Sequence, residues 1–435
     1  MREIEVFEGN RLGPGPPKES VAPARLYLTG VDFSGTPTAV SLDDDLLSRH
    51  VLILGGIGTG KTNTILHILE QLRGSMTRND VMIIFDTKGD FYQEFYRTGD
   101  IVFSKDKKAT GPDGPDFWNI FREVAGGTSL EEDVIEITRT LFFEKIQRSN
   151  QPFFPNAARD LLAAILLHFS RTQAIEEMDN RSLRGFLNRS PTSDLRLMLE
   201  AHEDLRAMTT YIADDRSPQT QGVFSELQQM VREILVGNFA RSGTLSIRQA
   251  VRDKGGRAIF IEYDLGVGNL LTPIYRLLLD LAIKEALSRE KSEGNVWFVI
   301  DEFRLAPNLQ HIDDGANFGR SLGAKFVVGV QNVEQVFHAY GEELGRSILS
   351  GFMTTIAFNV NDAATREFIK GLFGKNRKRE AYMASVQSRG LIEAVRDANV
   401  VEDWDITGLP VGRAIIGLPS QEPFLFQFDR FRSES

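Results

Sequence analysis

Residues 55–62 read Gly-Gly-Ile-Gly-Thr-Gly-Lys-Thr, a complete G-x-x-x-x-G-K-[ST] loop. The loop stands between the apolar run 51–54, which has the length of a buried parallel strand, and residues 61–73, whose apolar spacing is helical. Strand, glycine loop and helix form the context that this motif requires. In that context several backbone N–H groups and the helix N-terminus face a bound phosphate. The stretch therefore predicts a binding site for a nucleoside triphosphate.

Two side chains of this loop have predicted contacts with ATP and its metal ion. Lys61 is expected to reach the β- and γ-phosphates, and the Thr62 hydroxyl is expected to bind Mg²⁺. The predicted cofactors are therefore ATP and Mg²⁺. The residues expected to contact the nucleotide in and just after the loop are Gly55, Gly56, Ile57, Gly58, Thr59, Gly60, Lys61, Thr62 and Thr64.

Composition limits the kinds of site that the chain can hold. Its 435 residues are 42% hydrophobic, which suffices for a sizeable core and for about two or three domains. There is no cysteine, and the six histidines show no metal-ligand spacing, so we expect neither thiol chemistry nor a zinc site. The formal charge of −10 indicates that any contact with DNA is local, as inside a channel.

The sequence predicts no membrane segment. No apolar run approaches the roughly 18 to 20 residues that cross a bilayer, and the first five residues lack the hydrophobic region of a signal peptide. We therefore expect a cytoplasmic location.

Apolar runs spread along the chain predict a layered α/β fold with a mainly parallel sheet. Helix-like segments separate most of these runs, which are residues 25–28, 51–54, 81–85, 258–261, 296–300, 326–330 and 355–358. Residues 121–239 have helical spacing and no strand pattern, so they form either an inserted all-α domain or helices that cover the sheet. The expected domains are an N-terminal arm with a small β element (1–45), a P-loop ATPase motor (46–120 and 240–435) and the insertion (121–239).

Acidic side chains follow the apolar run 296–300 directly. This arrangement, with Asp301 and Glu302 at the end of a buried strand, is the Walker B element of P-loop NTPases. Asp301 is expected to hold Mg²⁺ through its water shell, and Glu302 to act as the general base that polarises the attacking water. Gln331 ends another buried run, where it can bridge the γ-phosphate or the water to the rest of a ring of subunits, or simply terminate the strand.

Three further polar features each have two interpretations. Arg320 can act on the γ-phosphate of a neighbouring subunit, or it is a surface helix arginine. Asp86 follows the run 81–85 and is expected to lie against the phosphate loop and contribute to nucleotide binding, with a salt-bridged turn as the alternative. The basic run 375–379 is either a solvated face or a contact with a phosphodiester backbone.

Taken in order, these elements resemble the conjugative coupling proteins of type IV secretion systems, the TraD/TraG-type members of the HerA/FtsK group of DNA-pumping ATPases. The resemblance covers the chain from about Val40 to its end. Each short element is weak alone, whereas the ordered set is specific. The elements that carry it are residues 50–54, the loop at 55–62, 85–90, 116–119, 245–248, 300–303, 319–320 and Gln331.

This resemblance implies a RecA-like motor domain with an inserted all-α domain and assembly into a hexameric ring. It further implies that Arg320 is a trans-acting arginine finger and that Gln331 senses the γ-phosphate. The implied partners are single- or double-stranded DNA in a central channel, further copies of the chain, and relaxase or secretion-channel proteins. Through such partners the resemblance also implies a place at the cytosolic face of the inner membrane. Most coupling proteins carry N-terminal transmembrane helices, and none is predicted here. A removed anchor, an anchor supplied by another subunit, or a soluble relative would each account for this departure.

The leading functional hypothesis is an ATP-driven, ring-forming DNA translocase, motivated by the order of Lys61, Asp301, Glu302, Arg320 and Gln331. An ATP-gated platform that docks secretion substrates on the helical insertion is one alternative. Another is a HerA-type motor for DNA repair or defence that works with a nuclease. The long insertion and the placement of the arginine and the glutamine argue against a metabolic kinase.

Overall fold

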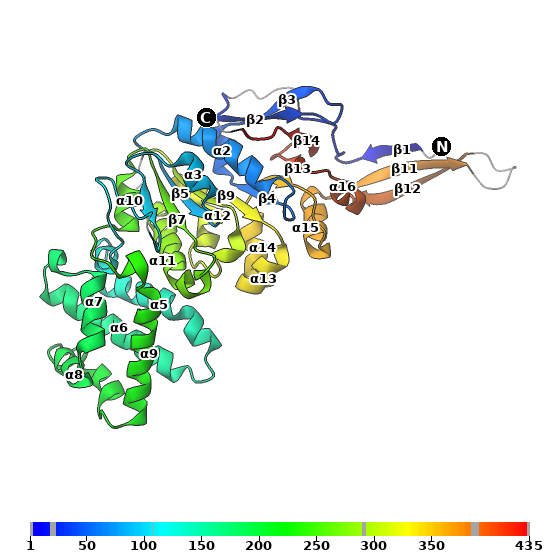
Figure 1. Ribbon diagram of the computed structural model, residues 1–435. Helices are drawn as coiled ribbons and strands as arrows, with labels where there is room; N and C mark the ends of the chain where they lie inside the picture. The colour runs from blue at the N-terminus through cyan, green and yellow to red at the C-terminus, as the bar shows by residue number, and fades with distance from the viewer. Residues whose placement is uncertain (1–2, 18–22, 107, 289–292, 384–390, 433–435) are drawn as a thin grey trace. The chain divides into compact units, whose positions relative to one another are not determined.

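The structure of the chain is a computed structural model that describes residues 3–17, 23–106, 108–288, 293–383 and 391–432. Its internal contacts divide the chain into two compact units. The first unit comprises Met1–Met76, Lys291–Asn308 and Ile312–Ser435, and the second comprises Thr77–Glu290 and Leu309–His311. Both units combine strands with helices (Figure 1).

The first unit is built on a mixed sheet. In it β10, β4, β9 and β8 run parallel to one another, and β13, β14, β2 and β3 extend the sheet antiparallel from β10. Every residue of β4 and β8 is buried, as expected for parallel strands covered on both faces. The strand order is β3 (Pro37–Leu42), β2 (Leu26–Val31), β14 (Phe424–Phe428), β13 (Arg413–Gly417), β10 (Thr354–Ala357), β4 (Val51–Leu54), β9 (Ala324–Val330) and β8 (Val296–Ile300).

Helices connect these strands. The longest described helix of the first unit, α2 (Lys61–Ser75), starts at the phosphate loop and buries the apolar residues Ile65, Ile68, Leu69 and Leu72. That spacing of three and four residues places them on one face of the helix. The others are α1 (Asp44–Ser48), the 3-10 turn η4 (Phe303–Leu305), α12 (Ile312–Leu322), α13 (Val333–Tyr340), α14 (Glu342–Ser350), α15 (Ala363–Phe373) and α16 (Asp403–Thr407).

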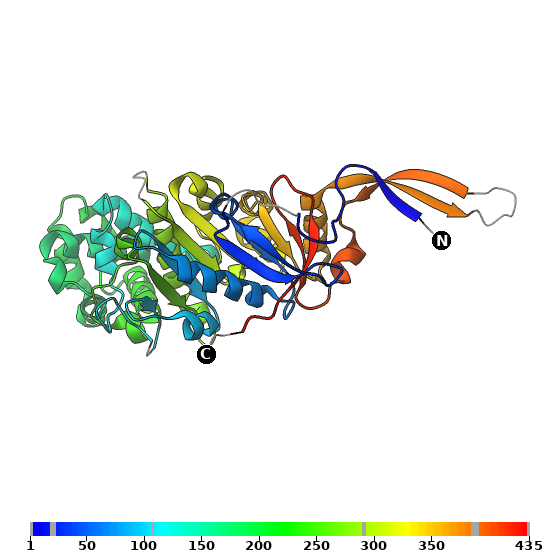
Figure 2. The ribbon, with the colours of Figure 1, turned by 90° about the horizontal axis from the view of Figure 1, so that it is seen from above.

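A separate three-stranded sheet completes the first unit. Figure 2 shows β1 (Glu3–Glu8), β11 (Lys375–Met383) and β12 (Leu391–Asn399) side by side, with β11 in the centre. Acidic residues on the outer strands face the basic run of β11, since Arg377 pairs with Glu8 and with Asp397, each at 3.4 Å. These exposed pairs give the basic run a role within its own sheet.

The second unit contains a parallel sheet with the order β5 (Val81–Asp86), β7 (Arg257–Glu262) and β6 (Ile101–Phe103). Most of its residues lie in helices. These are α3 (Asp90–Phe95), α4 (Ile120–Ala125), α5 (Leu130–Arg148), α6 (Phe153–Thr172), η1 (Ile175–Glu177), α7 (Asn180–Arg189), α8 (Thr192–Glu200), η2 (Arg206–Ile212), α9 (Pro218–Ile234), η3 (Gly237–Ala240), α10 (Ile247–Asp253) and α11 (Gly268–Ala286).

The secondary structure agrees with the pattern read from the sequence. Each of the predicted apolar runs contains a strand, and residues 121–239, all of which are described, hold helices and connecting segments without a strand. The two compact units follow spatial contacts and cut the chain at other points than 45, 120 and 239. The division into arm, motor and insertion therefore stays a prediction. Among the described residues, no helix combines the length and the apolar character needed to cross a membrane.

A short segment after the Walker B element belongs to the second unit because helices α5 and α11 hold it. The Asp280 carboxylate accepts hydrogen bonds from the backbone N–H groups of Gln310 at 2.7 Å and His311 at 3.2 Å. The His311 ring also lies 2.9 Å from the Glu136 carboxylate. The hydrogen bond to Glu136 raises the pKa of His311, so the protonated ring is favoured here.

His50, which precedes β4, gives the first unit a specific dependence on pH. Its ring is 1% exposed, packs edge-on against Phe326 at 5.1 Å and accepts a hydrogen bond from the Phe326 N–H. Burial, assisted by the charge of Lys325, lowers the pKa of His50 from 6.5 to about 4. The unfolded chain therefore binds a proton at a pH where the folded chain does not.

We expect the free energy of unfolding to fall by up to about 3 kcal/mol from this group as the pH drops from roughly 6.5 to roughly 4. The contribution is fully present above pH 6.5 because the folded state keeps the ring neutral. In the His50→Asn variant, whose new side chain tolerates the φ of 62°, urea unfolding should show a weaker loss between pH 7 and pH 4.5. An NMR titration of His50 with a midpoint near 6.5 would contradict this prediction.

Candidate functional site

The phosphate loop connects the end of β4 to the first turn of α2, as the motif requires. Gly60 precedes α2 with a φ of 126°, a backbone conformation that side chains with a Cβ rarely adopt. The Thr59 carbonyl accepts a hydrogen bond from the Gly412 N–H at 2.9 Å, and the Gly56 N–H donates to the Asn359 carbonyl at 2.8 Å. Segments far away in the sequence therefore support the loop from both ends.

The two chemically active side chains of the loop are held by different partners. The Lys61 ammonium group donates hydrogen bonds to the carbonyls of Gly55 at 2.7 Å and Gly56 at 2.9 Å, so it lies over the loop itself. The Thr62 hydroxyl lies 3.5 Å from a carboxylate oxygen of Asp301. A hydroxyl and a carboxylate at this distance are the oxygen ligands that suit Mg²⁺.

The ends of β8 and β9 bring a second pair of predicted residues together. The Gln331 side-chain amide donates a hydrogen bond to the Glu302 carboxylate. The other carboxylate oxygen of Glu302 lies 3.4 Å from the Arg304 guanidinium. Because β8 and β9 are parallel neighbours, their carboxyl ends meet at one edge, and Glu302 is only 7% exposed there. Thr62, Asp301, Glu302 and Gln331 thus belong to one edge of the sheet.

Gly329 allows β9 to approach the Walker B element closely. A Cβ atom at this position would lie 2.2 Å from the backbone carbonyl oxygen of Asp301, a distance that no side-chain adjustment relieves. We expect Gly329→Ala to lower the free energy of unfolding by about 1 to 3 kcal/mol because β8 and β9 must separate. Urea unfolding measures this change.

Gly371 in α15 is the matched control, because a Cβ atom there meets nothing within 4 Å. Gly371→Ala should stabilise the protein by about 0.5 to 1 kcal/mol, as alanine favours the helix. Equal effects of the two substitutions would contradict the proposed packing of β9 against Asp301.

Arg320 lies in the last turn of α12 and is half-exposed. Its guanidinium pairs with the Asp45 carboxylate at 2.6 Å, and its side chain is 49% exposed. No hydrogen bond or ion pair with the phosphate loop or with the Walker B acids is found for Arg320 among the described residues. The structure therefore leaves this arginine outside the cluster of Thr62, Asp301, Glu302 and Gln331.

The remaining predicted contacts have other surroundings. Asp86 belongs to the second unit, where its buried carboxylate accepts hydrogen bonds from the N–H groups of Lys88, Gly89 and Tyr92. Burial raises the pKa of Asp86 in spite of these bonds. Thr64 is fully buried and its hydroxyl contacts the Gly60 carbonyl, whereas Ile57 is 88% exposed. The nucleotide contacts of Asp86, Thr64 and Ile57 stay predictions.

Sequence reasoning missed several residues of the site. Asn359 follows β10 as Gln331 follows β9, so a search for polar residues at strand ends would have found it. Its side-chain amide donates to the carbonyls of Thr407 at 2.8 Å and Leu409 at 3.1 Å. No local sequence pattern distinguishes Gly412 or Gly329 from other glycines, because their importance depends on contacts with distant segments.

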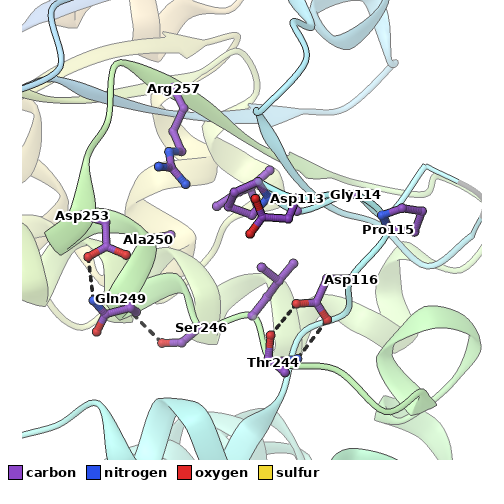
Figure 3. Close-up of a pocket in the computed structure, with 14 residues that line it drawn as sticks. Asp113, Gly114, Pro115, Asp116, Thr244, Ser246, Gln249, Ala250, Asp253 and Arg257 are labelled. Atoms are coloured by element: carbon purple, nitrogen blue, oxygen red, sulfur yellow. Dashed lines mark hydrogen bonds between the residues drawn. The ribbon is translucent and has the colours of Figure 1, made fainter.

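Two of the family-like elements meet in the second unit, beside a surface cavity of about 450 Å³ (Figure 3). The Asp116 carboxylate accepts hydrogen bonds from the Thr244 N–H and hydroxyl, and the Gln249 amide donates to Asp253 at 2.6 Å. The buried Glu123 accepts hydrogen bonds from the Trp118 ring at 2.9 Å and the Ser246 hydroxyl at 2.8 Å. These hydrogen bonds therefore join the segment around 116–119 to the segment around 245–248.

Sequence relatives point to one family. The profile of the family described as "Type IV secretion-system coupling protein DNA-binding domain" matches residues 36–424. The coupling protein TraD of Escherichia coli K12 is 22% identical over 97% of this chain and 58% of its own length. The type IV secretion system-coupling protein VirD4 of Bartonella quintana is 22% identical over 51% of this chain and 36% of its own length. The chain thus spans less than two thirds of these curated relatives.

Solved structures show the same fold. The bacterial conjugative coupling protein TrwBΔN70 in complex with sulphate has a TM-score of 0.72 at 20% identity, over 99% of this chain and 96% of that one. TrwB in complex with ADP and Mg²⁺ has a TM-score of 0.70 at 19% identity, with the same coverage. VirB4 of Thermoanaerobacter pseudethanolicus reaches 0.57 at 14% identity, over 93% of this chain and 96% of that one.

These likenesses confirm the predicted fold class, a RecA-like P-loop α/β fold with a mainly parallel sheet and an all-α part. The profile match extends over most of the chain and includes the phosphate loop, the Walker B acids, Arg320 and Gln331. The chain therefore belongs to the family of type IV secretion-system coupling proteins.

Proposed function

We propose that this chain is an ATP-hydrolysing, ring-forming DNA translocase that works as a type IV secretion coupling protein. The observation that carries the proposal is the meeting of Thr62 with Asp301, and of Glu302 with Gln331, at the carboxyl ends of β4, β8 and β9. This set provides metal ligands, a general base and a polar partner of that base. A protein that only binds nucleotide does not need the last two.

Each residue of the set has a distinct role in the proposed hydrolysis. The loop N–H groups and Lys61 would hold the phosphates, and Thr62 and Asp301 would hold Mg²⁺. Bound Mg²⁺ supplies positive charge to the phosphate oxygens. Glu302 accepts the proton of the attacking water, and Gln331 orients the Glu302 carboxylate. The complexes of TrwB with ADP and Mg²⁺ and with an ATP analogue support ATP and Mg²⁺ as the cofactors.

The ring is proposed on the basis of Arg320. Its half-exposed guanidinium has no contact with the phosphate loop or the Walker B acids among the described residues, which suits a role in the site of the next subunit. In this arrangement residues 46–120 and 240–435 form the motor and residues 121–239 form the inserted helical domain. DNA passes through the central channel, and relaxase or secretion-channel proteins contact the ring on the cytoplasmic side.

The proposal is tested by measuring ATP hydrolysis at low salt with no DNA, with single-stranded DNA and with double-stranded DNA. We expect at least one form of DNA to raise the rate. The Lys61→Ala variant should lose hydrolysis under all three conditions, because the phosphates of bound ATP then lack the positive charge of the lysine. If neither form of DNA stimulates the wild-type protein, the translocase proposal is wrong.

A further inference from the structure

Arg320 has one described partner, and that partner is itself fixed. The Arg320 guanidinium donates a hydrogen bond to one carboxylate oxygen of Asp45 at 2.6 Å. The other oxygen of the same carboxylate is contacted by the Arg49 guanidinium through Nε at 3.0 Å and Nη2 at 2.9 Å. Arg49 follows Asp45 by one helical turn, so local geometry maintains this second contact. Arg49 therefore holds the Asp45 carboxylate so that its other oxygen, Oδ1, points toward Arg320.

The Asp45 carboxylate carries a negative charge at neutral pH. Burial alone would raise the pKa of Asp45, but the hydrogen bond and charge of Arg49, with the charge of Arg320, lower the pKa below its ordinary value. Asp45 is thus ionised at neutral pH. It remains 52% exposed, so the ion pair with Arg320 is of the surface type, which contributes little to stability.

The two helices that carry the Asp45–Arg320 ion pair pack on β9, the parallel neighbour of the strand that precedes the Walker B acids. Both α1, which carries Asp45, and α12, which carries Arg320, pack on β9. A second ion pair joins the same elements, because Lys325 at the start of β9 contacts Asp44 at 2.6 Å. Strand β9 ends next to Gln331, the partner of Glu302. The helix that carries Arg320 and the residue that contacts Glu302 are therefore both attached to β9.

We propose that Asp45 is a positioning residue, which holds the Arg320 guanidinium in the direction needed to reach the ATP of the neighbouring subunit. The proposal rests on the ring and the trans role of Arg320 described above. A long arginine side chain on the surface samples many rotamers. If one of them is already fixed before the reaction, less side-chain entropy has to be lost on reaching the transition state. The cost of removing Asp45 should accordingly appear in kcat and not in ATP binding.

The test uses two kinds of subunit that complement each other. A receiver, Arg320→Ala, keeps an intact phosphate loop and Walker B acids but supplies no arginine to its neighbour. A donor, Lys61→Ala, supplies the arginine but cannot hydrolyse ATP at its own site. A mixture of the two should regain hydrolysis that neither has alone. Asp45→Asn is then introduced into the donor or into the receiver, and kcat and KM for ATP are measured in the presence of DNA.

We expect Asp45→Asn in the donor to lower kcat of the mixture by about tenfold, with KM changed less than about twofold. The same substitution in the receiver should leave kcat unchanged, and Asp45→Glu in the donor should restore most of it. Glu342→Gln in the donor is the matched control, since Glu342 forms an exposed i,i+4 pair with Arg346 at 2.9 Å. A general loss of structure would act equally in donor and receiver.

An equal loss in donor and receiver, no loss, or a gain in kcat would overturn the role of Asp45. If the mixture itself stays inactive while the wild-type ATPase is stimulated by DNA, Arg320 does not act in trans and the inference falls, but the translocase proposal stands. If DNA stimulation is absent in the wild type, the proposed function fails first.

Discussion

Arg320→Ala is expected to lower DNA-stimulated ATP hydrolysis by about 10³- to 10⁵-fold, the range found when an arginine finger is removed from P-loop NTPases. Its guanidinium is half-exposed and pairs with Asp45 instead of the loop at 55–62. A charge supplied to the γ-phosphate of a neighbour stabilises the transition state more than the ground state, so the loss should fall on kcat. Steady-state hydrolysis at saturating ATP measures it.

Arg346→Ala is the control for this substitution. Arg346 lies on α14, also pairs with an acidic residue, Glu342, and is 59% exposed. It should keep a rate within about twofold of the wild type, as expected of surface substitutions. Unchanged thermal unfolding of Arg320→Ala would show that the loss is chemical. A wild-type rate in Arg320→Ala would refute the role of the arginine finger.

Glu302→Gln is expected to lower the rate of hydrolysis by about 10²- to 10⁴-fold, the range for removal of a general base, while ATP binding is retained. The amide has nearly the same shape as the carboxylate and can still accept the hydrogen bond from Gln331. It cannot take a proton from water at neutral pH. A fluorescent ATP analogue measures binding, and release of inorganic phosphate measures turnover.

Glu343→Gln, on the exposed first turn of α14, controls for the loss of one negative charge. It should bind and hydrolyse ATP as the wild type does. If Glu302→Gln turned over at the wild-type rate, Glu302 would not be the base, and another group would have to activate the water. Failure of Glu302→Gln to bind ATP would instead assign Glu302 to the binding of nucleotide.

The parallel core of the first unit could be predicted because its strands are continuous apolar runs. Residues 51–54 and 296–300 are buried over their full length, so burial alone explains their composition. The sheet of β1, β11 and β12 was not predicted. Its central strand begins Lys375-Asn376-Arg377-Lys378-Arg379, and cross-strand ion pairs with acidic neighbours join it to the outer strands. Such pairing depends on partners about 370 residues away in the chain, as for Glu8 and Arg377.

The candidate site could be predicted where strand ends carry the chemistry. Asp301, Glu302 and Gln331 each follow an apolar run, and parallel strands bring their carboxyl ends to one edge. Asp45 could not be found in this way. It lies in a short helix far from Arg320 in the sequence, and only the packing of α1 and α12 on β9 brings the two together. Contacts of this kind depend on the tertiary structure.

The proposed function requires that this chain move along DNA by hydrolysing ATP. The most direct test is the displacement of streptavidin from the biotinylated end of a DNA fragment, followed over time with purified protein and ATP. We expect displacement by the wild type with ATP and none by Glu302→Gln or with a non-hydrolysable analogue. Displacement that proceeds equally with Glu302→Gln, or DNA-stimulated hydrolysis without any displacement, would contradict the proposed function.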